Sequence, residues 1–316
     1  MDDEDHTRIR RQLAGEFTVR RMEQLRPTVQ RVVNEHIDAL GIRTQADLYA
    51  DFALPIPSIV ICELLGVPEE DRHRFQQDST TTLDMTAAAT QKQAARSRLH
   101  AYMAGLVRTK RAHPGDDLLG RLVLRQSSEA TPLSDEELTR IGNLLLVAGH
   151  ETTANMIALG LAGFLTFPDW LERLQRYPDA MRLVVDEQLR LHSIVQHGLL
   201  RVARCDTELN GVHIAKGDYV LVALSAANRD PEIYSAPGTF NPHRDAQTHV
   251  AFGHGPHKCI GQNLARLELE VAWSTLLRRV PSLRLSRKLH LTDFKQEMTF
   301  YGVAQLPVTW GWILPA

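Results

Sequence analysis

The residues with the clearest chemical potential surround one cysteine. They read Phe252-Gly253-His254-Gly255-Pro256-His257-Lys258-Cys259-Ile260-Gly261. Glycines 253 and 255 let the backbone take unusual angles and approach a planar ring closely. A helix predicted from Gln262 to about Arg279 directs free backbone N–H groups at the sulfur. We therefore predict a thiolate ligand for a flat metal cofactor, with a lowered thiol pKa. A structural cysteine in a glycine-rich turn is the alternative.

A second group lies in the middle of the most apolar segment, Ala148-Gly149-His150-Glu151-Thr152-Thr153. A carboxylate and two hydroxyls among apolar residues are costly to bury. Threonine can bond back to an earlier carbonyl, and Gly149 weakens the same turn, so we predict a local bulge that admits water or a diatomic ligand. The alternative is a hydrogen-bonded polar patch inside a helix. His-Glu-x-x-His is absent, so zinc peptidase chemistry is unsupported.

The element that carries this group is predicted to be one long helix. Ser134 and Glu137 form a capping-box pattern at its start, and apolar residues then dominate up to Pro168. More than thirty residues rise roughly 45–50 Å, so the helix must cross the molecule, and its apolarity predicts burial. Upstream, residues 6–40 show helical spacing with one interruption expected at Pro27.

Short strands are expected after Gly198. The predicted strands cover residues 199–203, 212–214 and 219–224, with a hairpin turn at Asn210-Gly211. An irregular stretch follows over 229–261, then further short strands over about 283–310. We therefore predict one domain over residues 1–316, mainly α with a small segregated β region (α+β). Its helix-rich part covers about 1–197, and its β-rich part with the cysteine loop covers about 198–316.

The composition limits the possible classes. The 316 residues are 43% hydrophobic and 23% charged with a net charge of −2, which is normal for a soluble globular protein and gives no electrostatic case for nucleic acid. Three cysteines without a Cys-x-x-Cys pair argue against a disulfide framework or a zinc site. Residues 144–167 contain no uncharged run of about 18 residues, so we expect no membrane span. The first residues are charged rather than leader-like, and a cytoplasmic location is expected.

The cysteine string resembles the haem-ligand loop of the cytochrome P-450 superfamily, Phe-Gly-x-Gly-x-His-x-Cys-x-Gly, at every fixed position. The helix string resembles that family's Ala-Gly-x-Asp/Glu-Thr-Thr. The resemblance covers essentially the whole chain and is greatest for soluble actinobacterial hydroxylases. It implies the cytochrome P-450 fold and haem b, with the Cys259 thiolate as the iron ligand. It also implies oxygen binding at Ala148 and Gly149 and proton delivery by Glu151 and Thr152.

Two further motifs extend the resemblance. Glu187 and Arg190 match Glu-x-x-Arg, and Arg244 matches the arginine that joins that pair, so the three imply a structural cluster that supports the haem loop. The residues implied to contact haem are His6, Arg10, Ala148, Gly149, Arg201, Phe252, His257, Cys259 and Gly261. The residues implied to contact substrate, each equally explicable as core, are Leu144, Val147, Val195, Gln196, Met298 and Thr299, with residues 80–90 as part of the roof.

The family implies a monooxygenase that inserts one atom of O₂ into a lipophilic small molecule. Because the chain contains neither a flavin domain nor an iron–sulfur cysteine set, electrons are expected from a separate ferredoxin and ferredoxin reductase. Two alternatives remain, a non-catalytic helper with this fold and an oxidative cyclase or coupling enzyme of secondary metabolism.

The chain differs from other members of the family at its amino terminus. The helix with His6 and Arg10 begins almost at Met1, whereas relatives carry a helix, a β-hairpin and a lid segment before it. We therefore expect an N-terminally shortened member whose strands near 199–203 and 219–224 expose an edge. Weaker haem binding or poor hydroxylation is the expected consequence.

Overall fold

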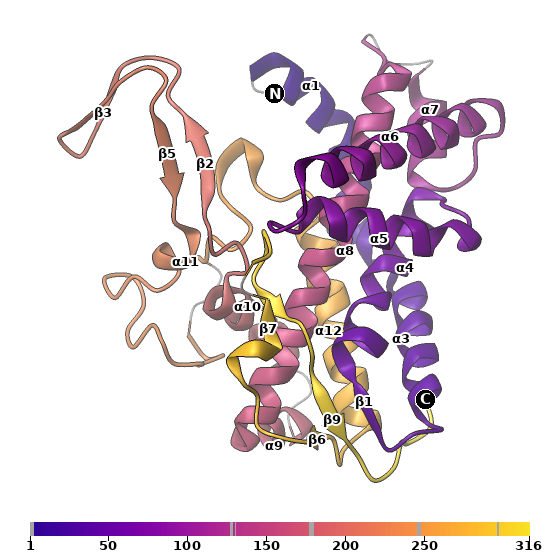
Figure 1. The fold of residues 1–316 in the computed structure, drawn as a ribbon, viewed down its shortest axis with the longest axis vertical. Coiled ribbons are helices and arrows are strands. Elements are labelled where there is room, and N and C mark those ends of the chain that lie inside the picture. Colours follow the sequence, from indigo (N-terminus) through magenta and orange to yellow (C-terminus); the bar gives the residue numbers. More distant parts are fainter. Residues whose placement is uncertain (1–2, 127–128, 130, 177–179, 245–247, 296) are drawn as a thin grey trace.

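Helices make up most of the molecule (Figure 1). The computed structural model describes residues 3–126, 129, 131–176, 180–244, 248–295 and 297–316. The helices are α1 Asp3–Ala14, α2 Val19–Glu23, α3 Arg26–Leu40, α4 Pro55–Leu65, α5 Arg72–Leu83, α6 Ala89–Ala112, α7 Leu118–Arg125, α8 Asp135–Thr166, α9 Pro168–Arg176, α10 Met181–His192, α11 Leu224–Ala227 and α12 Gln262–Arg279. Short 3₁₀ and π segments are Gly15–Phe17, Tyr49–Ala53, Glu69–Asp71, Gly255–His257 and Leu291–Asp293.

Helix α8 is the long central helix that the sequence predicts. Ser134 caps it and exchanges hydrogen bonds with Glu137, and the helix then runs through the core against α4, α6 and α12. Its length and composition would allow it to cross a membrane, but 72% of its most apolar window is buried inside the fold, as in the core helix of a soluble protein. At its far end the Trp273 ring of α12 packs over Gly160, where a side chain would not fit.

The sheets are small. The strands are β1 Gln45–Asp47, β2 Leu199–Val202, β3 Thr207–Leu209, β4 Val212–Ile214, β5 Tyr219–Val222, β6 Arg284–Leu285, β7 Phe294–Lys295, β8 Gly302–Val303 and β9 Pro307–Thr309. Of these, β6 and β8 pack against the central helix α8. All ladders are antiparallel, in the order β1-β9-β6 and as the pairs β2-β5, β3-β4 and β7-β8. Asn210 and Gly211 take positive φ of 49° and 79° in the predicted hairpin turn.

The ribbons β2-β5 and β3-β4 project from the helical body (Figure 1). Among the described residues β2 and β5 pair only with each other, so each keeps an open edge, as expected from the sequence, and Leu200, Val202, Tyr219 and Leu221 are exposed on them. The predicted strand over 219–224 ends two residues early, because α11 begins at Leu224.

One prediction for the amino-terminal helices is wrong. The chain does not break at Pro27, which lies in the first turn of α3, where a missing N–H is tolerated. The breaks fall instead at Gly15–Phe17 and at Gln24–Leu25. Thr18 starts α2 by accepting a hydrogen bond from the Arg21 N–H, so local capping decides the boundary.

Candidate haem-thiolate site

The loop before α12 presents the Cys259 thiol to solvent. Gly253 and Gly255 have φ of 72° and 75°, and a Cβ added to either would meet open space. The Cys259 N–H donates to the Phe252 carbonyl at 2.8 Å and closes the loop. Backbone N–H groups of Gly261 and Gln262, at the start of α12, donate to the Cys259 sulfur. The loop therefore combines an accessible sulfur with room for a flat group beside it.

The predicted lowering of the thiol pKa is wrong for the chain alone. Although Cys259 has exposed surface, desolvation by the surrounding protein atoms raises the pKa of its thiol. The N–H groups of Gly261 and Gln262 and the charges of Arg10 and Arg266 lower it, but they do not outweigh burial. Coordination to a metal ion would reverse this effect, because a metal-bound thiol is deprotonated outright.

One face of the otherwise buried α8 is open. Leu144 is 66% exposed, Ala148 is exposed and Thr152 is partly so, at intervals of one helical turn. Thr152 Oγ1 donates to the Ala148 carbonyl at 2.6 Å, the back-bond that the sequence predicts. The predicted bulge is absent, since α8 is continuous here. Gly149 serves packing instead, because a Cβ there would lie 2.9 Å from the Ile61 side chain.

The neighbouring Glu151 points into the protein and is 1% exposed. Its Oε2 accepts hydrogen bonds from the Tyr49 hydroxyl at 3.2 Å and from Lys295 Nζ at 3.1 Å. Sequence reasoning missed both partners, although an acid in an apolar helix requires a buried counter-charge. His150 is also buried, and its Nδ1 lies 3.3 Å from the Ser79 hydroxyl.

The structure brings Glu187, Arg190 and Arg244 together. Arg190 makes two hydrogen bonds to the Glu187 carboxylate, at 2.8 and 2.9 Å, and neither side chain has exposed surface. Arg244 Nε adds a third at 3.0 Å. Both guanidinium groups also donate to backbone carbonyls of the irregular stretch, including those of Asn228, Ser235 and Thr239. The cluster therefore fixes the path of a segment without regular structure.

Asn228 links this cluster to the cysteine loop, and no sequence signal singled it out. The side chain is fully buried; its Nδ2 donates to the Ser193 hydroxyl at 2.6 Å, and its Oδ1 accepts from the Val250 N–H at 2.8 Å. A second link is Asp186, which contacts His249 at 3.4 Å and Arg266 at 2.8 Å. Burial alone would raise the pKa of Asp186, but these two partners outweigh it and lower the pKa.

The basic residues predicted to contact haem lie in two separate parts of the molecule. The His6 and His257 rings lie 3.9 Å apart, and Arg10 donates to the Lys258 carbonyl, so α1 rests against the cysteine loop. Arg201 lies apart from them on the exposed strand β2, where its guanidinium donates to the Leu200 carbonyl at 3.0 Å.

The predicted substrate residues come from three segments that meet. The Thr299 hydroxyl and Met298 pair with the end of α5 at Leu83 and Asp84, part of the predicted roof. The Tyr301 N–H donates to the Ile194 carbonyl at 2.9 Å and so brings in the segment after α10. On that segment Val195 and Gln196 are half-buried, and the Gln196 amide donates to the carbonyls of His192 and Ser193. Val147 is half-buried beside the open face of α8.

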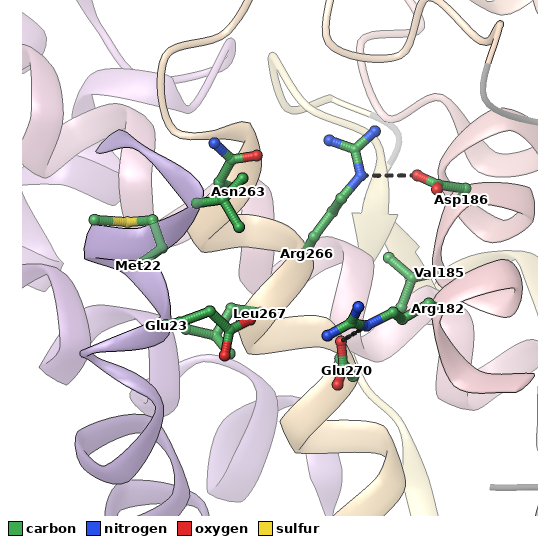
Figure 2. A pocket seen from close by; sticks show the side chains of 10 residues that line it. Met22, Glu23, Arg182, Val185, Asp186, Asn263, Arg266, Leu267 and Glu270 are labelled. Atoms are coloured by element: carbon green, nitrogen blue, oxygen red, sulfur yellow. Dashed lines mark hydrogen bonds and ion pairs between the residues drawn. The ribbon is translucent and has the colours of Figure 1, made fainter. Parts of the chain in front are cut away.

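A separate pocket of about 200 Å³ lies between α2, α10 and α12 (Figure 2). Its charges are largely paired within it, Arg266 with Asp186 and Arg182 with Glu270. None of the residues predicted to bind haem or substrate lines it. It is therefore a feature of the outer surface of α12 rather than the reaction site.

Comparison with known proteins decides the family. The cytochrome P-450 family model matches residues 179–295. Cytochrome P-450-SU2 of Streptomyces griseolus is 45% identical over 98% of this chain and 76% of its own length. The chain belongs to the cytochrome P-450 family. The mycinamicin VIII C21 methyl hydroxylase of Micromonospora griseorubida is 41% identical over 98% of this chain and 79% of its own. The crystal structure of CYP105P1 in complex with filipin I superposes with a TM-score of 0.95 at 43% identity, covering 99% of this chain and 79% of that chain.

Membership establishes a cytochrome P-450 monooxygenase with thiolate-ligated haem b and confirms the predicted fold. The residues present fit that cofactor. Cys259 offers a reachable sulfur beside open space, and Arg10 and His257 supply donors for anionic substituents on the same loop side. The open apolar stripe of Leu144 and Ala148 suits the face of a flat ring.

Replacing Asn228 by alanine tests the link between the buried cluster and the loop. The Asn228→Ala variant leaves the half-buried Val250 N–H without its acceptor, which should destabilise the protein by about 1–3 kcal/mol and weaken haem retention. Urea unfolding and haem transfer to apomyoglobin measure the two effects. Asn241→Ala, which removes an exposed hydrogen bond to the His243 N–H in the same stretch, should stay within about 0.5 kcal/mol of wild type. Equal behaviour of the two variants would contradict the link.

Proposed function

We propose that this chain inserts one oxygen atom from O₂ into a lipophilic secondary metabolite, using Cys259 as the iron ligand. The exposed Cys259, held in a glycine loop with open space beside it, is the observation that carries the proposal. The relatives support the substrate class, since they include pentalenic acid synthase of Streptomyces avermitilis, 43% identical over 311 residues, and a mycinamicin methyl hydroxylase. Leu144, Val147 and Met298 would give such a substrate apolar contacts.

Haem bound through the thiolate supplies O₂ activation and oxygen insertion. The protein residues hold that thiolate and supply protons. Gly261 and Gln262 N–H groups stabilise the Cys259 sulfur charge, and the Phe252 carbonyl holds the loop closed. The Thr152 hydroxyl lies on the open face of α8, where it can hold a water and pass on a proton.

Glu151 would serve as the carboxylate that returns a proton to the Thr152 hydroxyl after each transfer. Because it contacts Lys295 in the interior, it can reach the Thr152 side only by turning away from this partner. Arg10, His6, His257 and Arg201 would bind the haem propionates, with Arg201 contributing from β2.

A ferredoxin, reduced by its reductase, would deliver electrons in the cytoplasm at the side of the molecule that carries Cys259. Arg10 joins α1 to the Lys258 carbonyl, and Asn263 Nδ2 donates to the Phe17 carbonyl at 2.9 Å, so α1, α2 and the start of α12 border the cysteine loop. Arg11 and Arg20 are exposed on or next to these helices. Such basic side chains favour an acidic partner.

The ligand role of Cys259 is tested by the carbon-monoxide spectrum of the reduced, haem-loaded protein. Wild type should show the red-shifted Soret band of thiolate ligation and should form a monooxygenated product from a macrolide or terpenoid panel with ferredoxin, reductase and NADH. Cys259→Ser should lose both, because a serine hydroxyl is far less acidic than a thiol and offers no sulfur to the iron. Cys205→Ser, at the other exposed cysteine, is the control. A thiolate band that persists in Cys259→Ser would overturn the assignment.

Charge reversal at Arg20 tests the docking face. Arg20→Glu should raise the KM for ferredoxin by about 5- to 10-fold at low salt, and the difference should shrink at high salt because surface charges are screened. Arg278→Glu is the matched control, since Arg278 is exposed on α12 about 24 Å of helical rise from Gln262. Steady-state turnover against ferredoxin concentration supplies both values. A larger effect at Arg278 than at Arg20 would refute this docking face.

A further inference from the structure

Helix α5 is a polar helix with little apolar surface to hold it in place. Phe75 and Ser79 are its two buried residues, and most of the others are charged residues, glutamines or threonines. The Phe75 ring packs edge-on against Tyr102 of α6, with 4.4 Å between the ring centres, and Asp78 forms an ion pair with Arg98 of the same helix. Because so few buried apolar contacts hold α5, its position against the central helix α8 depends on polar contacts.

Ser79 makes a buried polar contact where α5 meets α8 (Figure 1). Its hydroxyl lies 3.3 Å from His150 Nδ1, and both side chains are 2% exposed or less. The next residue adds less, because Thr80 Oγ1 lies 3.5 Å from Glu151 Oε1, at the outer limit of a hydrogen bond. The contact between Ser79 and His150 is therefore the stronger of the two polar links between these helices.

Stability alone does not favour a histidine at position 150. His150 Nε2 is buried and has no hydrogen-bond partner in the part of the chain that the structure describes. An unpaired buried nitrogen is costly, and a leucine of similar size would avoid that cost. Burial lowers the pKa of His150, so the imidazole stays neutral and supplies no charge to its neighbours. What the ring does provide is the contact with Ser79 on α5.

The last turn of α5 extends this link to two residues predicted to contact substrate. Leu83 lies one helical turn after Ser79, so both are on the same side of the helix. The Leu83 carbonyl accepts hydrogen bonds from the Thr299 N–H at 3.2 Å and from the Thr299 hydroxyl at 2.9 Å. Asp84, the next residue, pairs with Met298 in an antiparallel bridge. A shift of α5 relative to α8 would therefore move Met298 and Thr299 as well.

Resting on the proposed function, we propose that His150 is a positioning residue for the substrate. By holding Ser79 it fixes the last turn of α5, and through that turn it fixes where Met298 and Thr299 meet the substrate, and so which position of the substrate is oxidised. His150 acts without touching the substrate. Residues two apart on a helix point about 200° apart, so the imidazole is directed away from the open face of α8 that carries Thr152.

Amide hydrogen exchange of the haem-loaded protein tests the contact without a substrate. Ser79→Ala and His150→Leu should each speed exchange in the last turn of α5 by about 3- to 10-fold, because one buried hydrogen bond is lost. The double variant should exchange like either single variant within about twofold, since both changes remove the same contact. Thr81→Ala is the matched control. Its hydroxyl donates to the Gln77 carbonyl within α5 at 3.0 Å, and exchange should stay within about twofold of wild type.

Product analysis tests the positioning role. The substrates are those members of the macrolide and terpenoid panel that the wild-type enzyme oxidises. Ser79→Ala and His150→Leu should change the ratio of oxidised positions by about threefold or more, because small displacements of a bound substrate change which atom reacts. Where a single position is oxidised, the product formed per NADH should change to the same extent. A purely structural residue would lower the yield of folded protein without changing these values.

The two measurements separate the possible failures. Faster exchange in both variants, with no panel member oxidised by wild type, would leave the contact between Ser79 and His150 in place and count against the proposed reaction. Unchanged exchange in α5, or unchanged products from variants of an active enzyme, would overturn the positioning role of His150. An equal effect of Thr81→Ala would also overturn it, because the loss of any hydroxyl would then loosen α5.

Discussion

Glu187 has no exposed surface, and a carboxylate buried in this way is stable only when its charge is fully paired. Arg190 and Arg244 satisfy that requirement, and each has donors left over after binding Glu187. Those donors bind backbone carbonyls of a segment that has little regular structure of its own. The need to neutralise one acid thereby orders the segment that leads to Cys259, with Asn228 passing the constraint to Val250.

The same rule applies to Glu151, the buried acid of α8. Glu151 is almost as deeply buried as Glu187, but its counter-charge comes from a single lysine rather than two arginines. Arginine holds a carboxylate with a rigid fork, whereas lysine offers a flexible point charge. The first arrangement suits a fixed support. The second leaves the carboxylate of Glu151 with a more adaptable partner.

Much of the fold follows from local sequence signals. The cap at Ser134, the turn at Asn210-Gly211 and the span of α12 are local, and each agrees with its prediction. The break expected at Pro27 failed because proline is also a good first-turn residue. The sequence motifs also correctly predicted that Glu187, Arg190 and Arg244 form one cluster. By contrast, Tyr49, Asn228 and Lys295 reach the site through contacts distant in sequence, and single residues of these types carry no spacing signal.

The direction of the pKa shift of the Cys259 thiol could not be predicted from the sequence. Helix N–H groups and nearby guanidinium groups act on Cys259 as expected, yet burial outweighs them, and their relative size depends on packing that a sequence does not show. The central claim is that Cys259 sulfur binds the haem iron. Iron K-edge X-ray absorption of the haem-loaded wild-type protein tests it most directly. The account predicts one sulfur neighbour in the first coordination shell of iron; a shell of nitrogen and oxygen alone would contradict it.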